Sequence, residues 1–124
     1  MIIIFRPFLQ HPILEIAALP EQQTAARQVF DQLGWKYRFV ADIAGFVSAR
    51  VIAMIINEAW FTVGDGISTR EEIDTAMKSG TSYPYGPFEW GEKIGLQNIG
   101  RLLTAMRASD SRYEIAPALQ AALS

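Results

Sequence analysis

Residues 42–96 read DIAGFVSARVIAMIINEAWFTVGDGISTREEIDTAMKSGTSYPYGPFEWGEKIGL, and this stretch decides the fold. It opens with a helix-length apolar block, Phe46 to Val63, which Gly64-Asp65-Gly66 closes. A helix of about 20 residues would be roughly 30 Å long, at about 1.5 Å per residue. Because that is the span of a small domain, we expect the rest of the chain to pack around this helix.

The predicted central helix is apolar on almost every side. At about 100° per residue, one continuous apolar face contains Ala49, Ile52, Ala53, Ile56, Ala59, Trp60 and Val63. The other side carries Arg50, Asn57, Glu58 and Thr62, with Val47, Val51, Met54 and Ile55 among them. Such a helix is normally buried on more than one side. It either lines a subunit interface or ligand cleft, or it is a core helix surrounded by its own chain. Its polar residues argue against a membrane span.

Composition limits the class of protein. A chain of 124 residues, half of them hydrophobic, forms one domain or part of a larger one and is not globally disordered. Its net charge of -2 argues against a general nucleic-acid binder. With no cysteine and a single histidine, His11, neither a disulfide framework nor a histidine-based metal cluster is expected. We read His11 as a solvent-exposed loop residue. The start of the chain does not resemble a secretory signal, so a cytoplasmic protein is the expectation.

Residues 1–41 predict a small βαβ element. Met1 to Phe5, Ile13 to Ala18 and Trp35 to Val40 resemble strands, and Thr24 to Leu33 has helical spacing. Strand, helix and strand within some 30 residues imply parallel pairing. Since parallel strands are normally covered on both faces, this part looks like the end of a larger sheet. We place the domain boundary at about residues 41–45.

The remainder of the chain predicts further helices. Ser68-Thr69-Arg70-Glu71 matches a capping box, in which Ser68 would cap a helix that runs to about Lys78 and stops at Gly80. The rigid loop Tyr83 to Pro87 would then lead into a short helix with Pro87 in first position. Two more helices follow, Leu96 to Ala108 and Ala116 to Leu123. The fold class is therefore mainly α.

Candidate chemical groups are sparse. Gly64-Asp65-Gly66 follows a helix and has no lysine after it, so it is a turn and not a phosphate loop. Arg50 lies among apolar neighbours and needs a carboxylate or carbonyl partner. Glu58 and Asp74 are helical acids that are either solvated or cap something. The Tyr83 to Phe88 loop suits either the lining of a cleft or a packed connection. None of these groups forms a self-sufficient catalytic constellation.

A series of short motifs runs through the chain in a fixed order: Asp42 to Arg50, Glu58-Ala59, Gly64, Ile73 to Gly80, Tyr83 to Phe88, Gly95-Leu96, and Arg112-Tyr113 with Pro117 and Leu119. They resemble the L-3-hydroxyacyl-CoA dehydrogenase family. The first is similar to that family's Asp-x-Pro-Gly-Phe-x-x-Asn-Arg motif, and the loop is similar to its Pro-Met-Gly-Pro-Phe segment. The resemblance covers the chain from Phe5 onward.

The resemblance implies a two-part enzyme. Family members join a Rossmann-type NAD domain to a C-terminal helical domain that covers the acyl-CoA and usually dimerises. They oxidise 3-hydroxyacyl-CoA to 3-ketoacyl-CoA in fatty-acid β-oxidation. On this reading residues 1–41 are the tail of the NAD domain and residues 42–124 are the helical domain. The resemblance therefore implies no cofactor site in this chain, and it implies substrate contacts at Arg50, Glu58, Tyr83, Pro84, Gly86 and Pro87.

Departures from the family pattern concern catalysis. Phe5-Arg6-Pro7 is similar to the end of the family's His-Phe-Phe-Asn-Pro motif, and Glu15 matches the glutamate that orients its catalytic histidine. The histidine position is then Ile3, which cannot take a proton. His11 is no substitute, because it lies only four residues before Glu15. The family's substrate-side asparagine is Ala49 here. We therefore expect no dehydrogenase activity from the chain alone.

Three interpretations remain open at this point. The chain could bind acyl-CoA and join a separate protein that supplies the NAD domain. It could be a non-catalytic module that forms a homodimer, or it could be a truncated dehydrogenase. The sequence predicts neither a nucleic-acid partner nor a membrane partner.

Overall fold

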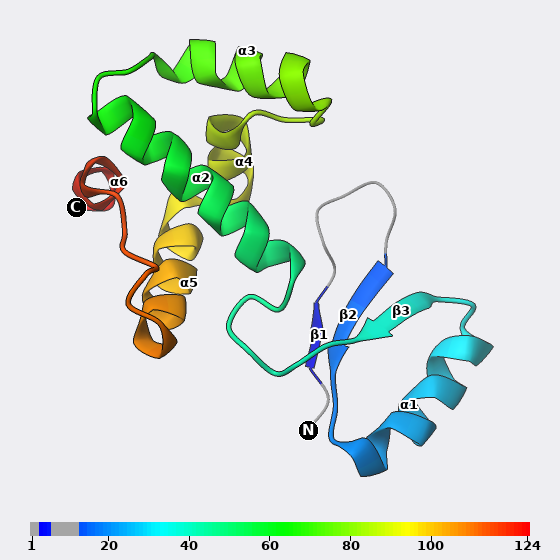
Figure 1. The fold of residues 1–124 in the computed structure, drawn as a ribbon. Coiled ribbons are helices and arrows are strands. Elements are labelled where there is room, and N and C mark those ends of the chain that lie inside the picture. The colour runs from blue at the N-terminus through cyan, green and yellow to red at the C-terminus, as the bar shows by residue number, and fades with distance from the viewer. Residues whose placement is uncertain (1–2, 6–12) are drawn as a thin grey trace. The chain divides into compact units, whose positions relative to one another are not determined.

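The computed structural model describes residues 3–5 and 13–124, with only the backbone described for 3–5. The chain divides into two compact units, residues 1–49 and residues 50–124. Figure 1 shows the elements in order: β1 (Ile3–Phe5), β2 (Ile13–Ala17), α1 (Pro20–Gln32), β3 (Lys36–Phe39), α2 (Ser48–Gly64), α3 (Arg70–Thr81), α4 (Pro87–Ile94), α5 (Leu96–Ser109) and α6 (Pro117–Ala122). This confirms the predicted fold class, a mainly helical chain that begins with a small βαβ element. The predicted domain limits, 1–41 and 42–124, stay a prediction.

The first unit is built on a three-stranded sheet in the order β1-β2-β3. Strands β2 and β3 are parallel, with Ile13 opposite Lys36, as the βαβ pattern predicts. Strand β1 is antiparallel to β2, with Phe5 opposite Glu15, which the sequence pattern did not predict. Helix α1 connects β2 to β3 and packs on the sheet through a core of Leu14, Ile16, Ala26 and Phe30.

Helix α1 begins earlier than the sequence predicted. Its apolar spacing begins near Thr24, but the helix starts at Pro20, whose fixed φ angle suits the first helical position. At the other end Gly34 has a φ of 68°, the left-handed conformation that glycine adopts most easily. The predicted glycine stop is therefore confirmed, and the proline is the start signal that the spacing missed.

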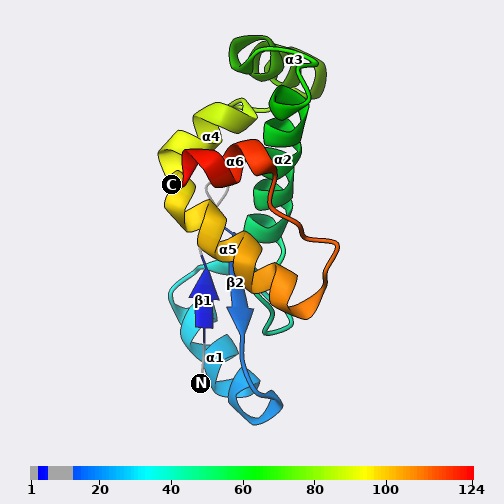
Figure 2. The ribbon, with the colours of Figure 1, turned by 90° about the vertical axis from the view of Figure 1, so that its left-hand side faces the viewer.

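The second unit is organised around α2, which runs through the middle of it in Figure 1. Its buried residues are Ile52, Ala53, Ile56, Asn57, Ala59 and Trp60. They share the interior with buried side chains of the later helices: Phe88, Trp90, Ile99, Leu103, Met106 and Leu119. Figures 1 and 2 show α6 beside α5, and a Cβ on Gly100 of α5 would come within 2.6 Å of Leu123. A larger residue at position 100 would therefore require the Leu123 side chain to shift.

Asn57 is buried, although the helical pattern places it on the polar side of α2. Its Nδ2 donates to the Glu114 carbonyl at 2.7 Å, and its Oδ1 accepts from the Ala116 amide at 2.9 Å. A buried amide is stable only when it is hydrogen-bonded in this way. The pattern misplaced Asn57 because its partners lie far along the chain, in the α5–α6 connection.

The cap of α3 differs from the sequence prediction by one residue. Thr69 is the N-cap and accepts from the Glu72 amide, while the Glu72 carboxylate accepts from the Thr69 amide. The predicted cap, Ser68, instead donates its hydroxyl to Glu72 at 2.8 Å. The helix also passes Gly80 and ends at Thr81, because Ser82 takes the left-handed conformation with a φ of 56°.

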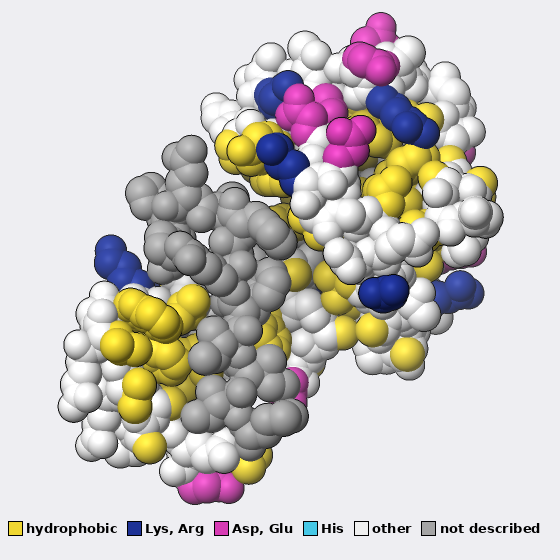
Figure 3. Space-filling model, turned by 180° about the vertical axis from the view of Figure 1, so that it is seen from behind, with side chains coloured by type: hydrophobic (Ala, Val, Ile, Leu, Met, Phe, Trp, Pro, Cys, Tyr) yellow, Lys and Arg dark blue, Asp and Glu magenta, His cyan; other side chains and the backbone are white. Residues whose placement is uncertain are grey.

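Two further observations concern the surface and the length of the helices. Figure 3 shows acidic and basic side chains interspersed over the helical unit on that face, with no large area of one sign. In the described part of the chain, no helix combines the length and apolar character needed to cross a membrane.

Candidate functional site

A groove of about 450 Å³ lies along one face of α2. It is lined by Arg50, Val51, Met54, Ile55, Glu58 and Tyr113. Five of these residues come from two turns of α2, where positions three and four apart fall on the same face. The central helix is therefore buried on one side and lines an open, mainly apolar groove on the other. This favours the first of the two readings that its periodicity allowed.

One end of the groove is cationic and aromatic. Arg50 donates from Nη2 to the Tyr113 hydroxyl at 2.8 Å, and its Cζ lies 4.6 Å from the centre of the Tyr113 ring. Arg112 donates to the same hydroxyl at 2.5 Å and also lies against the ring. The hydrogen bond from Arg50, more than any other contact, holds the pKa of Tyr113 below its usual value. The Tyr113 phenol is thus one partner of Arg50, and the carboxylate or carbonyl partner that the sequence predicted stays a prediction.

The other end of the groove carries Glu58, an exposed carboxylate. Arg50 and Glu58 are eight residues apart on α2, so their backbones are separated by about 12 Å along the helix. Between them the groove wall is formed by Val51, Met54 and Ile55. The arrangement suits an elongated aliphatic ligand or a second apolar surface.

The predicted Tyr83 to Phe88 loop lies in the connection between α3 and α4 and does not line the groove. Tyr83 packs on Trp90 at 5.3 Å between ring centres, and the Tyr85 ring lies 4.6 Å from Lys93 Nζ. Pro87 is buried and starts α4, and Pro84 is exposed. The structure thus brings Arg50 and Glu58 together and places the loop residues in a second group. The substrate role predicted for both groups stays a prediction.

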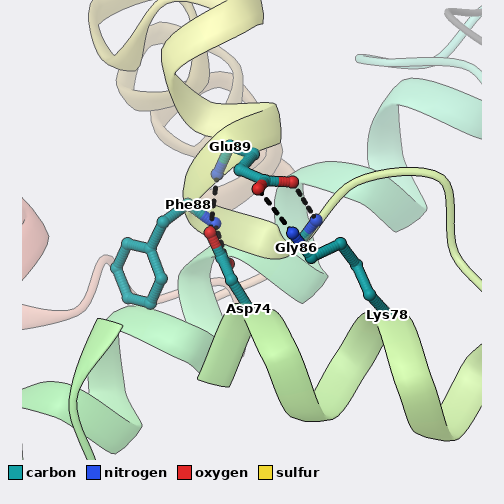
Figure 4. Close-up of polar contacts among 5 residues, drawn as sticks. All are labelled: Asp74, Lys78, Gly86, Phe88 and Glu89. Atoms are coloured by element: carbon teal, nitrogen blue, oxygen red, sulfur yellow. Dashed lines mark hydrogen bonds and ion pairs between the residues drawn. The ribbon is translucent and has the colours of Figure 1, made fainter. Parts of the chain in front are cut away.

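Asp74 organises that second group (Figure 4). Its carboxylate is buried and accepts from the Phe88 amide at 2.8 Å and the Glu89 amide at 3.1 Å, at the start of α4. Asp74 therefore caps the start of α4. A capping role is one of the two alternatives that the sequence left open. A Cβ on Gly86 would lie 2.3 Å from the Asp74 carboxyl, so the loop needs glycine there.

Glu89 closes the same network. It accepts from the Gly86 amide at 2.9 Å and from Lys78 Nζ at 2.6 Å (Figure 4). The Lys78 contact, followed by the Gly86 hydrogen bond, lowers the pKa of the Glu89 carboxyl. These contacts bind α3, the loop and α4 into one rigid unit. The Tyr83 to Phe88 loop is therefore a packed connection between α3 and α4, which is one of the two alternatives that the sequence left open.

Glu15, the predicted match to the family's orienting glutamate, is buried on β2. Its carboxylate accepts from the Val47 amide at 3.1 Å, and from the Ser48 amide at 3.0 Å and hydroxyl at 2.6 Å. It therefore caps the first turn of α2 within the first unit. Ile3 pairs with Ala17 through the backbone, its side chain lies outside the described residues, and so does His11.

The sequence reading missed the role of Tyr113 and the target of Asp74. Tyr113 meets Arg50 across 63 residues of chain, so no local spacing links them. The only signal was the Arg112-Tyr113 pair, which was noted solely as part of the family resemblance. Asp74 was noted as a helical acid, but its target lies 14 residues on. In the part of the chain that the structure describes, no group of three or more His, Cys, Asp or Glu side chains could hold a metal ion.

Comparison with known proteins gives a consistent result. Residues 45–123 match the family model described as "3-hydroxyacyl-CoA dehydrogenase, C-terminal domain". Over 64 residues the chain is 48% identical to the 3-hydroxyadipyl-CoA dehydrogenase of Escherichia coli K12, which covers 52% of this chain and 14% of that protein. It is 37% identical over 82 residues to the 3-hydroxybutyryl-CoA dehydrogenase of Clostridioides difficile, covering 64% of this chain and 29% of that protein.

Solved structures show the same fold. The crystal structure of (S)-3-hydroxybutyryl-CoA dehydrogenase from Ralstonia eutropha superposes with a TM-score of 0.82 at 28% identity, covering 88% of this chain and 41% of that one. The 3-hydroxybutyryl-CoA dehydrogenase from Escherichia coli K12 gives a TM-score of 0.77 at 35% identity, covering 90% of this chain and 25% of that one. The chain thus spans less than half the length of these relatives.

Proposed function

Because this chain belongs to the 3-hydroxyacyl-CoA dehydrogenase family, matching its C-terminal domain, we propose that it binds 3-hydroxyacyl-CoA or a related acyl thioester. It would act as the substrate-binding part of an NAD-dependent dehydrogenase of fatty-acid metabolism. The observation that carries the proposal is the groove on α2, which places the family-matched Arg50 and Glu58 at the two ends of an apolar wall. The expected compartment is the cytoplasm.

NAD does not fit the βαβ element of this chain. A dinucleotide site needs a glycine-rich turn between strand and helix, so that backbone amides can approach the pyrophosphate. Here Ala18 and Leu19 join β2 to α1, and Pro20, which has no N–H, is the first helical residue. No hydride-transfer step is therefore assigned to the described residues. The NAD-binding part would come from a separate partner protein.

Within the groove, each side chain has a definite capacity. The Arg50 guanidinium can donate to a thioester carbonyl or a phosphate oxygen, because it presents several N–H groups in one plane. Val51, Met54 and Ile55 can cover an aliphatic chain, since burial of each methylene group contributes about 0.8 kcal/mol. The Glu58 carboxylate would repel an anionic group at the end of the groove opposite Arg50.

Calorimetric titration with acetoacetyl-CoA, with and without NAD, tests the proposal. We expect micromolar binding, about -8 kcal/mol, and the same affinity with NAD present. Arg50→Ala should weaken binding without unfolding the domain. Arg107→Ala, which removes an exposed cation from α5, is the matched control and should bind as the unaltered chain does. No heat of binding in either titration would rule out the thioester ligand.

A second candidate function is homodimer formation through the same face of α2. The observation in its favour is the apolar wall of the groove, in which Val51 is 53% exposed in the single chain and Met54 and Ile55 are half-buried. Contiguous apolar surface of this kind often marks an interface. On this reading the chain is an assembly module, and a second copy occupies the groove in place of a ligand.

A further inference from the structure

The turn that ends α2 contains the one place in the sequence where an aspartate or asparagine precedes a glycine, Asp65-Gly66. Figure 1 shows this turn where α2 leads into α3. Residues 64–67 are exposed, and a Cβ built on Gly66 would meet no atom within 4 Å. The peptide bond between Asp65 and Gly66 is therefore open to water and is not crowded by neighbouring groups.

Two backbone hydrogen bonds close this turn. The Gly66 amide donates to the Val63 carbonyl at 3.0 Å, and the Ile67 amide donates to the Thr62 carbonyl at 3.1 Å. This is the Schellman pattern, in which the residue after the helix is left-handed, here Gly66 with a φ of 70°. The apolar contact that often accompanies the pattern is weak, because the Ile67 side chain is 72% exposed. Helix ends fray, so the turn should open locally at a low cost in free energy.

Opening of the turn frees the Gly66 amide to react with the Asp65 side chain. The Gly66 nitrogen attacks Cγ of Asp65 and closes a five-membered imide ring, while the carboxyl hydroxyl leaves with the amide proton as water. Glycine favours this step because no Cβ crowds the attacking nitrogen. Water then adds to one of the two imide carbonyls. Opening at the main-chain carbonyl leaves the chain linked through Cγ with a free α-carboxylate, so one water leaves, one returns, and no other reactant is needed.

The other four aspartates of the chain lack this combination of features. Asp74 is buried, and its carboxylate accepts two amide hydrogen bonds. Asp110 is ion-paired to an arginine at 3.0 Å. Asp31 lies within α1 and accepts a hydrogen bond from a tyrosine hydroxyl at 2.9 Å. Asp42 precedes isoleucine, whose branched side chain hinders attack by its amide. The structure therefore singles out Asp65.

We propose that Asp65-Gly66 is a modification site, at which the folded chain spontaneously acquires an isoaspartyl linkage as it ages. The inference does not depend on thioester binding, because Asp65 does not line the groove. The new linkage adds one carbon atom to the main chain, so the two hydrogen bonds that close the turn cannot both form again. The end of α2 also packs on α6, since a Cβ on Gly64 would lie 3.2 Å from the Ala118 side chain. The modified helical unit should therefore be less stable.

Ageing of the full chain at neutral pH and physiological temperature tests the proposal. A protein-isoaspartate methyltransferase transfers labelled methyl groups from S-adenosylmethionine to the free α-carboxylate of an isoaspartyl residue. Trypsin then cuts after Arg50 and Arg70 and releases residues 51–70, in which Asp65 is the only aspartate. Electron-based fragmentation of this peptide locates the linkage, although the mass is unchanged. We expect the label in residues 51–70 to increase with time, and to increase faster in urea, where the turn is open.

Variants assign the label to one residue. Asp65→Glu changes an exposed side chain and should remove the label, because glutamate would have to close a six-membered ring. Asp65→Asn should gain the label faster than the unaltered chain, because a neutral amide cyclises more readily than an ionised carboxylate. Asp110→Glu is the control and should leave the label unchanged. Circular dichroism checks that each variant is folded.

Each outcome bears on the proposal. Label that accumulates in residues 51–70 of the folded chain, and that Asp65→Glu removes, supports the site. Label that forms in urea but not in the folded chain shows that the turn stays closed, and it overturns the proposal. Label at another residue, or label that persists in Asp65→Glu, overturns the assignment to Asp65. The purified isoaspartyl form should melt at a lower temperature than the unaltered chain, and equal melting temperatures would overturn the predicted damage to the end of α2.

Discussion

At the scale of single residues, Asp74 provides the cap that α4 cannot provide for itself. The N-cap of α4 is Gly86, which has no side chain, and the first helical residue is Pro87, which has no N–H. The next two amides, of Phe88 and Glu89, both donate to the Asp74 carboxylate. The free donors of a helix start are therefore satisfied by a residue of another helix, 14 positions earlier.

Two glycines give opposite predictions for the same substitution. Gly86→Ala should destabilise the helical unit by about 1–3 kcal/mol, because the new Cβ would overlap the Asp74 carboxyl at 2.3 Å. Gly80→Ala, in α3, should stabilise it by about 0.5–1 kcal/mol, because a Cβ there meets no atom within 4 Å. Urea denaturation of the two variants measures both changes. A Gly86→Ala variant as stable as the unaltered chain would contradict the Asp74 contact.

Tyr113 should titrate at a lower pH than Tyr37. Arg50 and Arg112 lower the pKa of Tyr113, whereas burial and the Asp31 carboxylate raise the pKa of Tyr37. Tyr113 therefore contributes stability above its unfolded pKa of about 10, and that contribution is lost as the pH falls through its lower folded pKa. The contribution of Tyr37 is complete below about pH 10 and is lost as the pH rises through its higher folded pKa.

Ultraviolet absorbance of phenolate measures this order. The ionisation that Tyr113→Phe removes should lie at a lower pH than the ionisation that Tyr37→Phe removes. If both variants lose the same part of the curve, the Arg50–Tyr113 contact does not form in solution.

At the scale of elements, the sequence predicted the type of every helix and strand but not all of their ends. Apolar spacing located α2 and α5 because their buried faces repeat every three to four residues. It missed the start of α1 because Pro20 carries no apolar signal, and it misplaced the α3 cap because Ser68 and Thr69 are chemically equivalent as N-caps. Helix ends depend on single hydrogen bonds, which composition does not reveal.

In the candidate site, too, the sequence predicted what lies close together along the chain and missed the long-range contacts. Arg50 and Glu58 could be placed on one face because they lie eight residues apart on one helix. Tyr113 and Asn57 could not be placed, because their partners lie 57 to 63 residues away in sequence. Tertiary contacts of that range are set by packing of whole helices and leave no local pattern.

The cap of α3 offers a test of the element boundary. Thr69→Ala should destabilise the helical unit by about 1 kcal/mol, because it removes the acceptor for the Glu72 amide. Ser68→Ala should cost less, since it removes only an exposed hydroxyl contact to the Glu72 side chain. Thermal unfolding of the two variants compares them directly. The reverse order would restore Ser68 as the cap.

At the scale of the whole molecule, the open face of α2 decides between a monomer and a homodimer. Met54→Lys or Ile55→Lys would place a charge in the apolar wall of the groove. If a second copy covers that wall, either variant should be monomeric, because an unpaired buried charge is strongly unfavourable. Light scattering after size exclusion measures the mass. Ala105→Lys, at an exposed position on α5, is the control. A dimer that persists in both groove variants would rule out this interface.

The buried carboxylate of Glu15 limits how the chain can be divided. A cut at residues 41–45 would remove the Val47 and Ser48 donors from the sheet and leave Glu15 buried without hydrogen bonds. A cut after residue 49 would keep those donors but sever α2 within its first turn. Neither position yields two intact pieces. Within the first unit, recombination that exchanges strand β2 must therefore carry residues 47 and 48 with it, so that Glu15 keeps its donors.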